Sequence, residues 1–349
     1  MAIDTATQAA ATEAVRYSAE AGAPRYLTSY IARRAYKDEV QHPPVVNGVR
    51  GVIDVHCHAH DGQQDALDLA KYASVNGMRG LLYKSIVGRA RPAESVRKLL
   101  DALHRWAEEA KVEPIQAWAG YNIGSGDELA SPATVREQIE DGVTAIWMPT
   151  ARSARTLHKI GGPPIWWDKT ANPRSHTGPL PWEEAKRNGH FLLEDSFELK
   201  ASVREIFHVV ADTGVTVSFA HATHPELFAM AEETKRLGIK RALVDHPFSP
   251  FVDLNLEQMR QLTSEGIYLN FTFDELSPLL GVDPAVMCDT IRSLGVDCVT
   301  LSSDCGEPLF PNSVEAMRQI RGYMRAFGLS AEEVDVATIR NPEKLVGLQ

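Results

Sequence analysis

Features that mark several classes of protein are missing from this 349-residue sequence. No run approaches the roughly 18 consecutive apolar residues that a membrane-spanning helix needs. The net charge of -10 leaves no broad cationic surface, so neither nucleic acid nor an anionic membrane is expected as a partner. Walker A, G-x-S-x-G and G-x-G-x-x-G motifs are all missing, which argues against kinases, serine hydrolases and dinucleotide-dependent enzymes. A small molecule remains the expected partner.

Cysteine is also scarce: only 4 residues occur, and no two form a C-x-x-C pair. The first residues, MAIDTATQAAAT, lack both the basic start and the apolar stretch of a secretory signal. Together these observations predict a reduced, cytoplasmic protein. Apolar residues make up 44% of the chain and charged residues 23%, which is typical of a globular protein with a sizeable core.

A repeated unit runs through most of the chain. Six times a helical pattern ends at a glycine that is followed closely by an apolar run; these glycines are Gly77, Gly142, Gly214, Gly238, Gly266 and Gly295. Glycine commonly ends helices because it adopts a positive φ without strain. Two further apolar runs, residues 51–56 and 114–121, bring the expected strands to eight. Buried strands alternating with helices over about 250 residues predict an α/β protein with a (β/α)8 TIM barrel.

Two segments fall outside this unit. Residues 1–48 are expected to form an N-terminal helical extension that either caps the barrel floor or mediates contacts in a homo-oligomer, with the barrel itself at residues 49–349. An insertion at about residues 151–195, after the fourth strand, is too long for an ordinary connection and is expected to overhang the barrel mouth. Its Trp166 and Trp167 either line a substrate pocket or pack the insertion itself.

Polar residues end several of the predicted strands. They are His56 and His58 after strand 1, Lys84 after strand 2, His221 after strand 5, His246 after strand 6 and Asp304 after strand 8. Barrel enzymes keep their active sites at the carboxyl ends of the strands. Alternation along a strand places the two histidines of the H-x-H pair on one face, with Cys57 facing the helix layer as a packing residue.

Neutral imidazoles with a carboxylate form a ligand set suited to zinc, manganese or iron, whereas calcium would need more oxygen ligands. One such residue is often only a hydrogen-bonded core group, but five converging on one rim indicate a metal site. Arg89 and Arg91, after strand 2, are either grips for a substrate carboxylate or ordinary surface charges.

In this order and spacing, residues 51–349 resemble the amidohydrolase superfamily of metal-dependent hydrolase barrels. The segments GMRGLLYKS, IWMPT, HPEL, DHPF, LSSDCG and NPEKLVGL are similar to a little-characterised family within it, whose substrates are largely unassigned. The resemblance implies that His56, His58, His221 and Asp304 are metal ligands. It also implies that His246 is either a ligand of a second metal or a catalytic group.

The sequence departs from the best-known binuclear members after strand 4. Those members carry a bridging carboxylated lysine or a glutamate there, where this chain has Trp147-Met148-Pro149-Thr150. Either Lys84 takes the bridging role or the site holds one metal ion.

The resemblance therefore predicts a metal-dependent hydrolase with one or two divalent ions, zinc first and manganese or iron as alternatives. A metal-activated water would cleave an amide, lactam, lactone or ester bond of a small molecule, with Asp304 and His246 as the catalytic groups. A metal-dependent non-oxidative decarboxylase is the second interpretation. A non-catalytic barrel that binds metal and ligand is the third.

Overall fold

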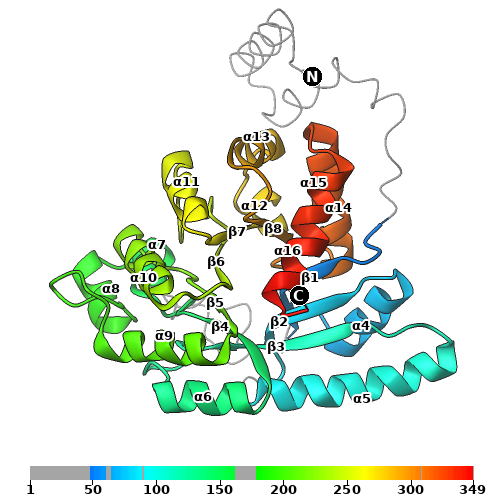
Figure 1. The fold of residues 1–349 in the computed structure, drawn as a ribbon, viewed down its shortest axis with the longest axis horizontal. Helices are drawn as coiled ribbons and strands as arrows, with labels where there is room; N and C mark the ends of the chain where they lie inside the picture. Colours follow the sequence, from blue (N-terminus) through cyan, green and yellow to red (C-terminus); the bar gives the residue numbers. More distant parts are fainter. Residues whose placement is uncertain (1–47, 60–63, 89, 162–177, 308, 349) are drawn as a thin grey trace, which may run out of the picture.

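Eight parallel strands form the centre of the protein. The computed structural model describes residues 48–59, 64–88, 90–161, 178–307 and 309–348. Each strand pairs with the next along the chain, in the order β1 to β8. The strands are β1 (Ile53–Ala59), β2 (Gly80–Ile86), β3 (Gln116–Asn122), β4 (Val143–Trp147), β5 (Thr216–Ser218), β6 (Ala242–Asp245), β7 (Tyr268–Thr272) and β8 (Val299–Ser302). Their alternation with helices confirms the (β/α)8 barrel predicted from the sequence (Figure 1).

The barrel closes between its first and last strands. The amide of His58 donates to the carbonyl of Cys305 at 2.9 Å, and the amide of Asp304 donates to the carbonyl of His56 at 2.8 Å. Cys57 and Cys305 form a parallel bridge at the same place. This seam is the β1 segment with the chain just after β8, and it carries three of the predicted metal ligands.

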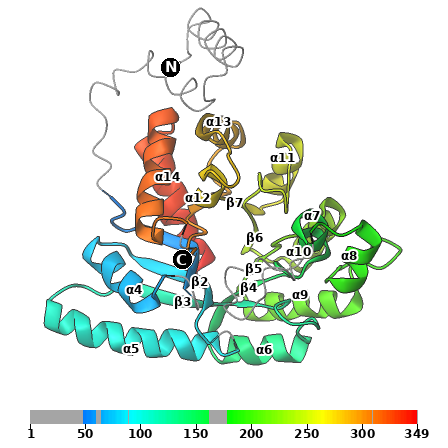
Figure 2. The same cartoon turned by 180° about the vertical axis from the view of Figure 1, so that it is seen from behind.

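Helices surround the strands, as the two opposite views show (Figures 1 and 2). The helices between strands are α4 (Ala66–Val75), α5 (Pro92–Ala110), α6 (Pro132–Glu140), α7 (Ala154–Ile160), α8 (Trp182–Asn188), α9 (Ala201–Thr213), α10 (His224–Leu237), α11 (Leu256–Ser264), α12 (Phe273–Leu276) and α13 (Pro284–Leu294). After β8 come α14 (Ser313–Phe327), α15 (Ala331–Asp335), η3 (Val336–Arg340) and α16 (Asn341–Leu345). Helix α14 packs against both α13 and α4, so the helical layer continues across the seam.

Local sequence explains why the helices begin and end where they do. Pro92 stands at the first position of α5, and Val96, Leu99 and Leu103 bury one face of this helix. All six glycines predicted to end helices have a positive φ. None of the helices in the described ranges has the length and apolar composition needed to cross a membrane.

The predicted insertion is described only in part. Helices α7 and α8 lie within it, whereas residues 162–177 are outside the described ranges. The ring of Trp182 contacts those of His158 and Phe191 edge-on, at centroid distances of 5.6 and 5.5 Å. This tryptophan therefore packs the insertion. The predicted N-terminal extension also falls outside, except for Gly48.

Candidate metal centre

Backbone geometry at three strand ends aims polar side chains at the barrel mouth. Ala220, His246 and Asp304 have positive φ values of 51°, 37° and 48°. Non-glycine residues rarely adopt this conformation, and where they do it is often at a functional site. The three residues follow β5, β6 and β8 within two positions. The chain therefore turns sharply at three strand ends, at or next to the candidate ligands His221, His246 and Asp304.

Four histidines at this mouth are held in the same way, each by its Nδ1 atom. His56 Nδ1 contacts Asp245 Oδ1 at 2.9 Å, and His58 Nδ1 contacts Ser85 Oγ at 2.7 Å. The Nδ1 atoms of His221 and His246 lie 2.8 Å from Thr156 Oγ1 and Ser249 Oγ respectively. An imidazole held through one nitrogen presents the other to a metal, and such supporting contacts set its tautomer and orientation.

Asp245 fixes the tautomer of His56. Its carboxylate also accepts hydrogen bonds from Trp147 Nε1 at 2.8 Å, Ser218 Oγ at 2.5 Å and Asn270 Nδ2 at 2.7 Å. The carboxylate is fully buried, and four donors saturate its two oxygens. Because a saturated carboxylate only accepts, His56 must donate from Nδ1, so Nε2 is the atom that a metal would use, by displacing the proton that Nε2 carries when the ring is charged.

The Nε2 atom of His56 is an orphaned buried polar atom. It lies 3.0 Å from Asp304 Oδ1, yet it makes no hydrogen bond within the described part of the chain. Buried polar atoms without a partner are rare in native proteins. A metal ion bound by His56 Nε2 and Asp304 would satisfy this atom, so these residues fit such an ion.

The tautomer of His221 follows from its hydroxyl partner. Thr156 Oγ1 donates its only proton to the carbonyl of Thr150 at 2.8 Å. It can therefore only accept from His221, which must donate from Nδ1. The Nε2 lone pair of His221 is thus left for a ligand. The ring of Phe251 stacks on His221 at a centroid distance of 4.4 Å and holds its plane.

Asp304 lies close to three of the four imidazoles. Its Oδ1 is 2.9 Å from His58 Nε2 and 3.0 Å from His56 Nε2, and its Oδ2 is 3.8 Å from His246 Nε2. The rings of His56 and His58 are 5.3 Å apart, and those of His221 and His246 are 4.9 Å apart. His56, His58 and Asp304 form the one group in the described ranges whose ligand atoms are close enough together to hold an ion as they stand.

Lys84 lies at the same barrel mouth as these candidate ligands. It is 7% exposed, and no hydrogen bond or ion pair of its ammonium group occurs among the described residues. Its positive charge helps to lower the pKa values of His58, His221 and His246. The neighbouring position at the end of β4 is filled by Trp147, which is 1% exposed. Gly120 makes room for this ring, because a Cβ there would lie 2.5 Å from it and 3.0 Å from Lys84 Cα.

Burial and charge together set the protonation states. Burial lowers the pKa of His58 to about 3 and that of His246 to about 4, so both are neutral. Burial also opposes a charge on His56, yet the carboxylates of Asp304 and Asp245 raise its pKa to about 9. The charge of His56 holds the pKa of both carboxyl groups below the ordinary range despite their burial. The centre thus combines neutral imidazoles with two ionised carboxylates, and it holds one positive charge on His56 where a cation would bind.

Asp54 joins the two sides of the seam. Its Oδ1 accepts from the amides of His56 and Ser303, both at 3.1 Å, and its Oδ2 accepts from Ser303 Oγ at 2.5 Å. Burial raises the pKa of this carboxyl group to about 6. Through these contacts Asp54 fixes the backbone that carries His56 relative to the backbone that carries Asp304.

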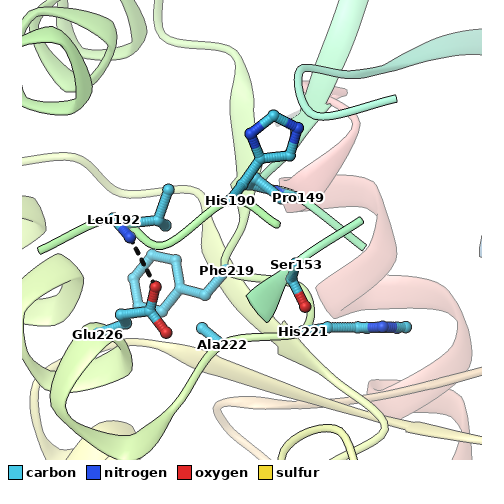
Figure 3. Close-up of a pocket in the computed structure, with 8 residues that line it drawn as sticks. All are labelled: Pro149, Ser153, His190, Leu192, Phe219, His221, Ala222 and Glu226. Atoms are coloured by element: carbon cyan, nitrogen blue, oxygen red, sulfur yellow. Dashed lines mark hydrogen bonds between the residues drawn. The ribbon is translucent and has the colours of Figure 1, made fainter. Parts of the chain in front are cut away.

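A small gap beside His221 is a packed support. Figure 3 shows its lining residues, with a hydrogen bond of 2.8 Å from the Leu192 amide to the Glu226 carboxylate. Glu226 also accepts from the amide and hydroxyl of Thr223, at the start of α10. The gap has no room for a water molecule. We conclude that it holds the loop of His221 in place and does not admit a substrate.

The structure brings the predicted metal ligands together, but it does not place the predicted substrate-binding residues beside them. His56, His58, Lys84, His221, His246 and Asp304 all lie at one mouth, whereas Arg89, Trp166 and Trp167 lie outside the described residues. Arg91 is exposed at the start of α5. It forms no hydrogen bond or ion pair with the ligands among the residues described, so its role in substrate binding stays a prediction.

The sequence pattern assigns no role to two acidic residues of this centre, Asp245 and Asp274. Asp245 is a polar residue at a strand end, but its partners come from β1, β4, β5 and β7, and only the barrel topology and strand register bring them together. Asp274, in α12, accepts a hydrogen bond from Thr272. Its burial and the charge of Asp304 raise its pKa well above the ordinary value. The sequence signal for Asp274 is its position two residues after the end of β7.

Solved structures share this architecture at low sequence identity. An amidohydrolase from Pseudomonas aeruginosa is 11% identical with a TM-score of 0.53, and the match covers 87% of this chain and 99% of that one. A structure from work on engineering organophosphate hydrolysis from a lactonase template is 16% identical with a TM-score of 0.51, covering 87% and 97%. A protein of Agrobacterium tumefaciens, solved without ligand, is 11% identical with a TM-score of 0.50, covering 86% and 97%. The fold is therefore that of the amidohydrolase barrels, as the resemblance predicted.

Residues 51–270 match the model of a family of unknown function, DUF6282, and the chain belongs to this family. No curated protein matches the chain.

Proposed function

We propose that this protein is a metal-dependent hydrolase that cleaves an amide, lactam, lactone or ester bond of a small molecule. One observation carries the proposal: four histidines are each anchored through Nδ1 around a central Asp304, and the Nε2 atoms of His56 and His58 lie within 3.0 Å of its Oδ1. Such an arrangement offers several lone pairs to divalent ions. The likeness to an amidohydrolase and to a lactonase-derived enzyme is consistent with it.

Imidazole and carboxylate ligands favour zinc, with manganese and iron as alternatives. When bound, such an ion supplies an acidified water and polarises the electrophile of the substrate. The histidines lie in two pairs at the mouth that also holds Asp304 and Lys84. We therefore propose two ions. Lys84 would take the bridging role, because Trp147 at the end of β4 offers no ligand atom for it.

The residues of the chain would divide the remaining work. Asp304 Oδ1 lies 3.0 Å from His56 Nε2, whereas Oδ2 lies 3.8 Å from His246 Nε2, and Oδ2 is the oxygen that would take a proton and return it to the leaving group. His246 would orient the electrophile or bind the second ion. Ser249 and Thr156 would keep His246 and His221 in place.

The setting of the protein is also proposed. All four cysteines are free thiols, which is consistent with a reducing compartment such as the cytoplasm. The net charge of -10 continues to favour a small-molecule substrate over nucleic acid or membrane. Whether copies of the chain associate stays a prediction, because residues 1–47 lie outside the described ranges.

Metal content and turnover test the proposal together. Protein purified without chelator should hold about one to two equivalents of metal and hydrolyse members of an amide, lactam, lactone and ester panel. Replacing both His56 and His58 by alanine should remove most of the metal and the activity while circular dichroism stays unchanged. His104→Ala, at an exposed position on α5, is the matched control. Full activity in metal-free protein would exclude the proposal, and carbon dioxide release from a carboxylic acid panel would favour the decarboxylase.

A further inference from the structure

One arginine near the metal centre is buried, and the part of the chain that the structure describes offers it no matching partner. Arg155 is the second residue of α7, and its side chain is 15% exposed. Its Nε atom is buried and makes no hydrogen bond within the described ranges. Among the described residues, the nearest carboxylate oxygen belongs to Asp253 and lies 3.8 Å from one terminal nitrogen, and the Asp253 side chain is 67% exposed. Such a long contact with a solvated carboxylate leaves most of the guanidinium donors unused.

Other arginines of this chain are better paired. Arg321 is as buried as Arg155, at 14% exposed, and its Nε also makes no hydrogen bond within the described ranges, but its terminal nitrogens lie 2.9 Å from Asp335 and donate to Thr338. Arg152, three residues before Arg155, lies 2.6 Å from Asp127. Burying an arginine without hydrogen bonds is unfavourable unless the side chain has another role. This difference from the other arginines therefore makes Arg155 a candidate for such a role.

The position of Arg155 relates it to the metal centre. The next residue, Thr156, contacts His221 through its hydroxyl group. On the other side, Asp253 follows Phe251 by two residues, and Phe251 stacks on the same histidine. Both chain segments that flank the guanidinium therefore also contact His221. A group held by Arg155 would lie at the edge of the mouth nearest this histidine.

We propose that Arg155 binds an anionic group of the substrate, a carboxylate or a phosphate, while the bond to be cleaved lies over the metal centre. The inference rests on the proposed function for the reacting end of the substrate. Guanidinium suits this task because its planar fork donates two parallel hydrogen bonds to a carboxylate or phosphate. The substrate class is thereby narrowed to small molecules with an acid group remote from the cleaved bond.

Anion binding to the metal-free full-length protein tests the subsite without any turnover. Isothermal titration would use succinate, inorganic phosphate and the neutral analogue succinamide as probes. The wild-type protein should bind at least one of the two anions and should not bind succinamide. Arg155→Gln should weaken that binding by about tenfold or more, and Arg155→Lys should weaken it less, because the charge remains while the fork is lost. The anion that binds more tightly indicates whether the acid group of the substrate is a carboxylate or a phosphate.

Two matched variants control the result. Arg152→Gln, at an arginine already paired with Asp127, should leave anion binding within about twofold of wild type. The double replacement of His56 and His58 by alanine should also keep it. Thermal unfolding and circular dichroism check that each variant is folded.

Three results would overturn the subsite: no anion binding by the wild-type protein, equal binding by folded Arg155→Gln, or binding that disappears only in the histidine variant. Because no metal or turnover enters the titration, the subsite and the hydrolase activity can fail independently. Arginine-dependent anion binding in a protein without hydrolytic activity would contradict only the proposed function.

Discussion

Among single residues, Lys84 bears most directly on the number of metal ions. A free ammonium at this mouth would repel bound cations strongly, because the surroundings are buried. Reaction of the amine with carbon dioxide would convert it to an anionic carbamate that can bridge two ions. The end of β4 cannot supply such a ligand, since Trp147 fills it and donates to Asp245.

Lys84→Ala should therefore lose the second metal and most of the activity. A short carboxylic acid added to this variant should restore both in part by occupying the vacated position. Metal analysis and turnover of the variant measure the outcome, with Lys98→Ala as a control on the exposed face of α5. Two metals and normal turnover in Lys84→Ala would exclude the bridging role. One metal in the wild-type protein, with Lys84 paired to a substrate carboxylate, would move the decarboxylase ahead of the hydrolase.

Asp245 supports a second prediction at this scale. Asp245→Asn keeps the size of the side chain but replaces one acceptor oxygen by an amide, which cannot accept from Trp147, Ser218 and His56 together. We expect metal affinity to fall about 10- to 100-fold, the usual effect of losing such a supporting carboxylate. Competition with a chromophoric chelator measures the affinity. An unchanged value would mean that Asp245 serves packing alone, and Asp297→Asn controls for the change of charge.

At the scale of elements, α10 connects the loop of His221 to the rest of the barrel through Glu226. Burial raises the pKa of this carboxyl group above its ordinary 4.5. The folded protein therefore holds the proton more tightly than the unfolded chain does. The resulting stability is complete below the ordinary pKa and is lost as pH rises through the raised one.

Glu226→Gln removes that dependence because glutamine does not titrate. Its free energy of unfolding should fall less than that of the wild type as pH rises from about 4.5 to 7. Urea unfolding at several pH values gives the comparison. Glu232→Gln, at an exposed position on the same helix, should follow the wild-type curve. Parallel curves for Glu226→Gln and wild type would show that its proton is not linked to folding.

The elements were also the most predictable level of this molecule. Glycines at helix ends and apolar runs identify eight strands because both signals are local in the sequence. The backbone turns at Ala220, His246 and Asp304 were not predictable, since their positive φ values occur at non-glycine residues. The same limit applies to Asp245, whose four donors come from four other strands and meet only through the barrel topology and strand register. The H-x-H pair and the strand-end residues predict a candidate ligand set because barrel topology brings all carboxyl ends to one face.

At the scale of the whole molecule, the barrel should stay folded without metal. The core is a continuous cluster of buried apolar side chains that spans all eight strands, so the fold does not depend on the centre. Metal that binds only the folded state nevertheless adds stability by mass action, about 4 kcal/mol at a thousandfold excess over Kd. Zinc should therefore raise Tm and a chelator should lower it, while circular dichroism remains that of the folded protein.

Differential scanning calorimetry with zinc or chelator measures this shift. The protein with alanine at His56 and His58 should show almost no response to either. Unfolding on metal removal would show that the centre is structural, and an equal zinc response in the variant would place the stabilising metal elsewhere.

The seam that closes the barrel has a further consequence for handling this protein. Cys57 stands between His56 and His58, Cys305 follows Asp304, and both thiols are fully buried. Burial raises the pKa of each thiol well above its ordinary value, so a thiolate-specific reagent finds little to attack in the closed barrel. Labelling must wait until the first and last strands separate. The rate at which these two cysteines react therefore measures how often the barrel opens at this seam, which carries the candidate ligands His56, His58 and Asp304.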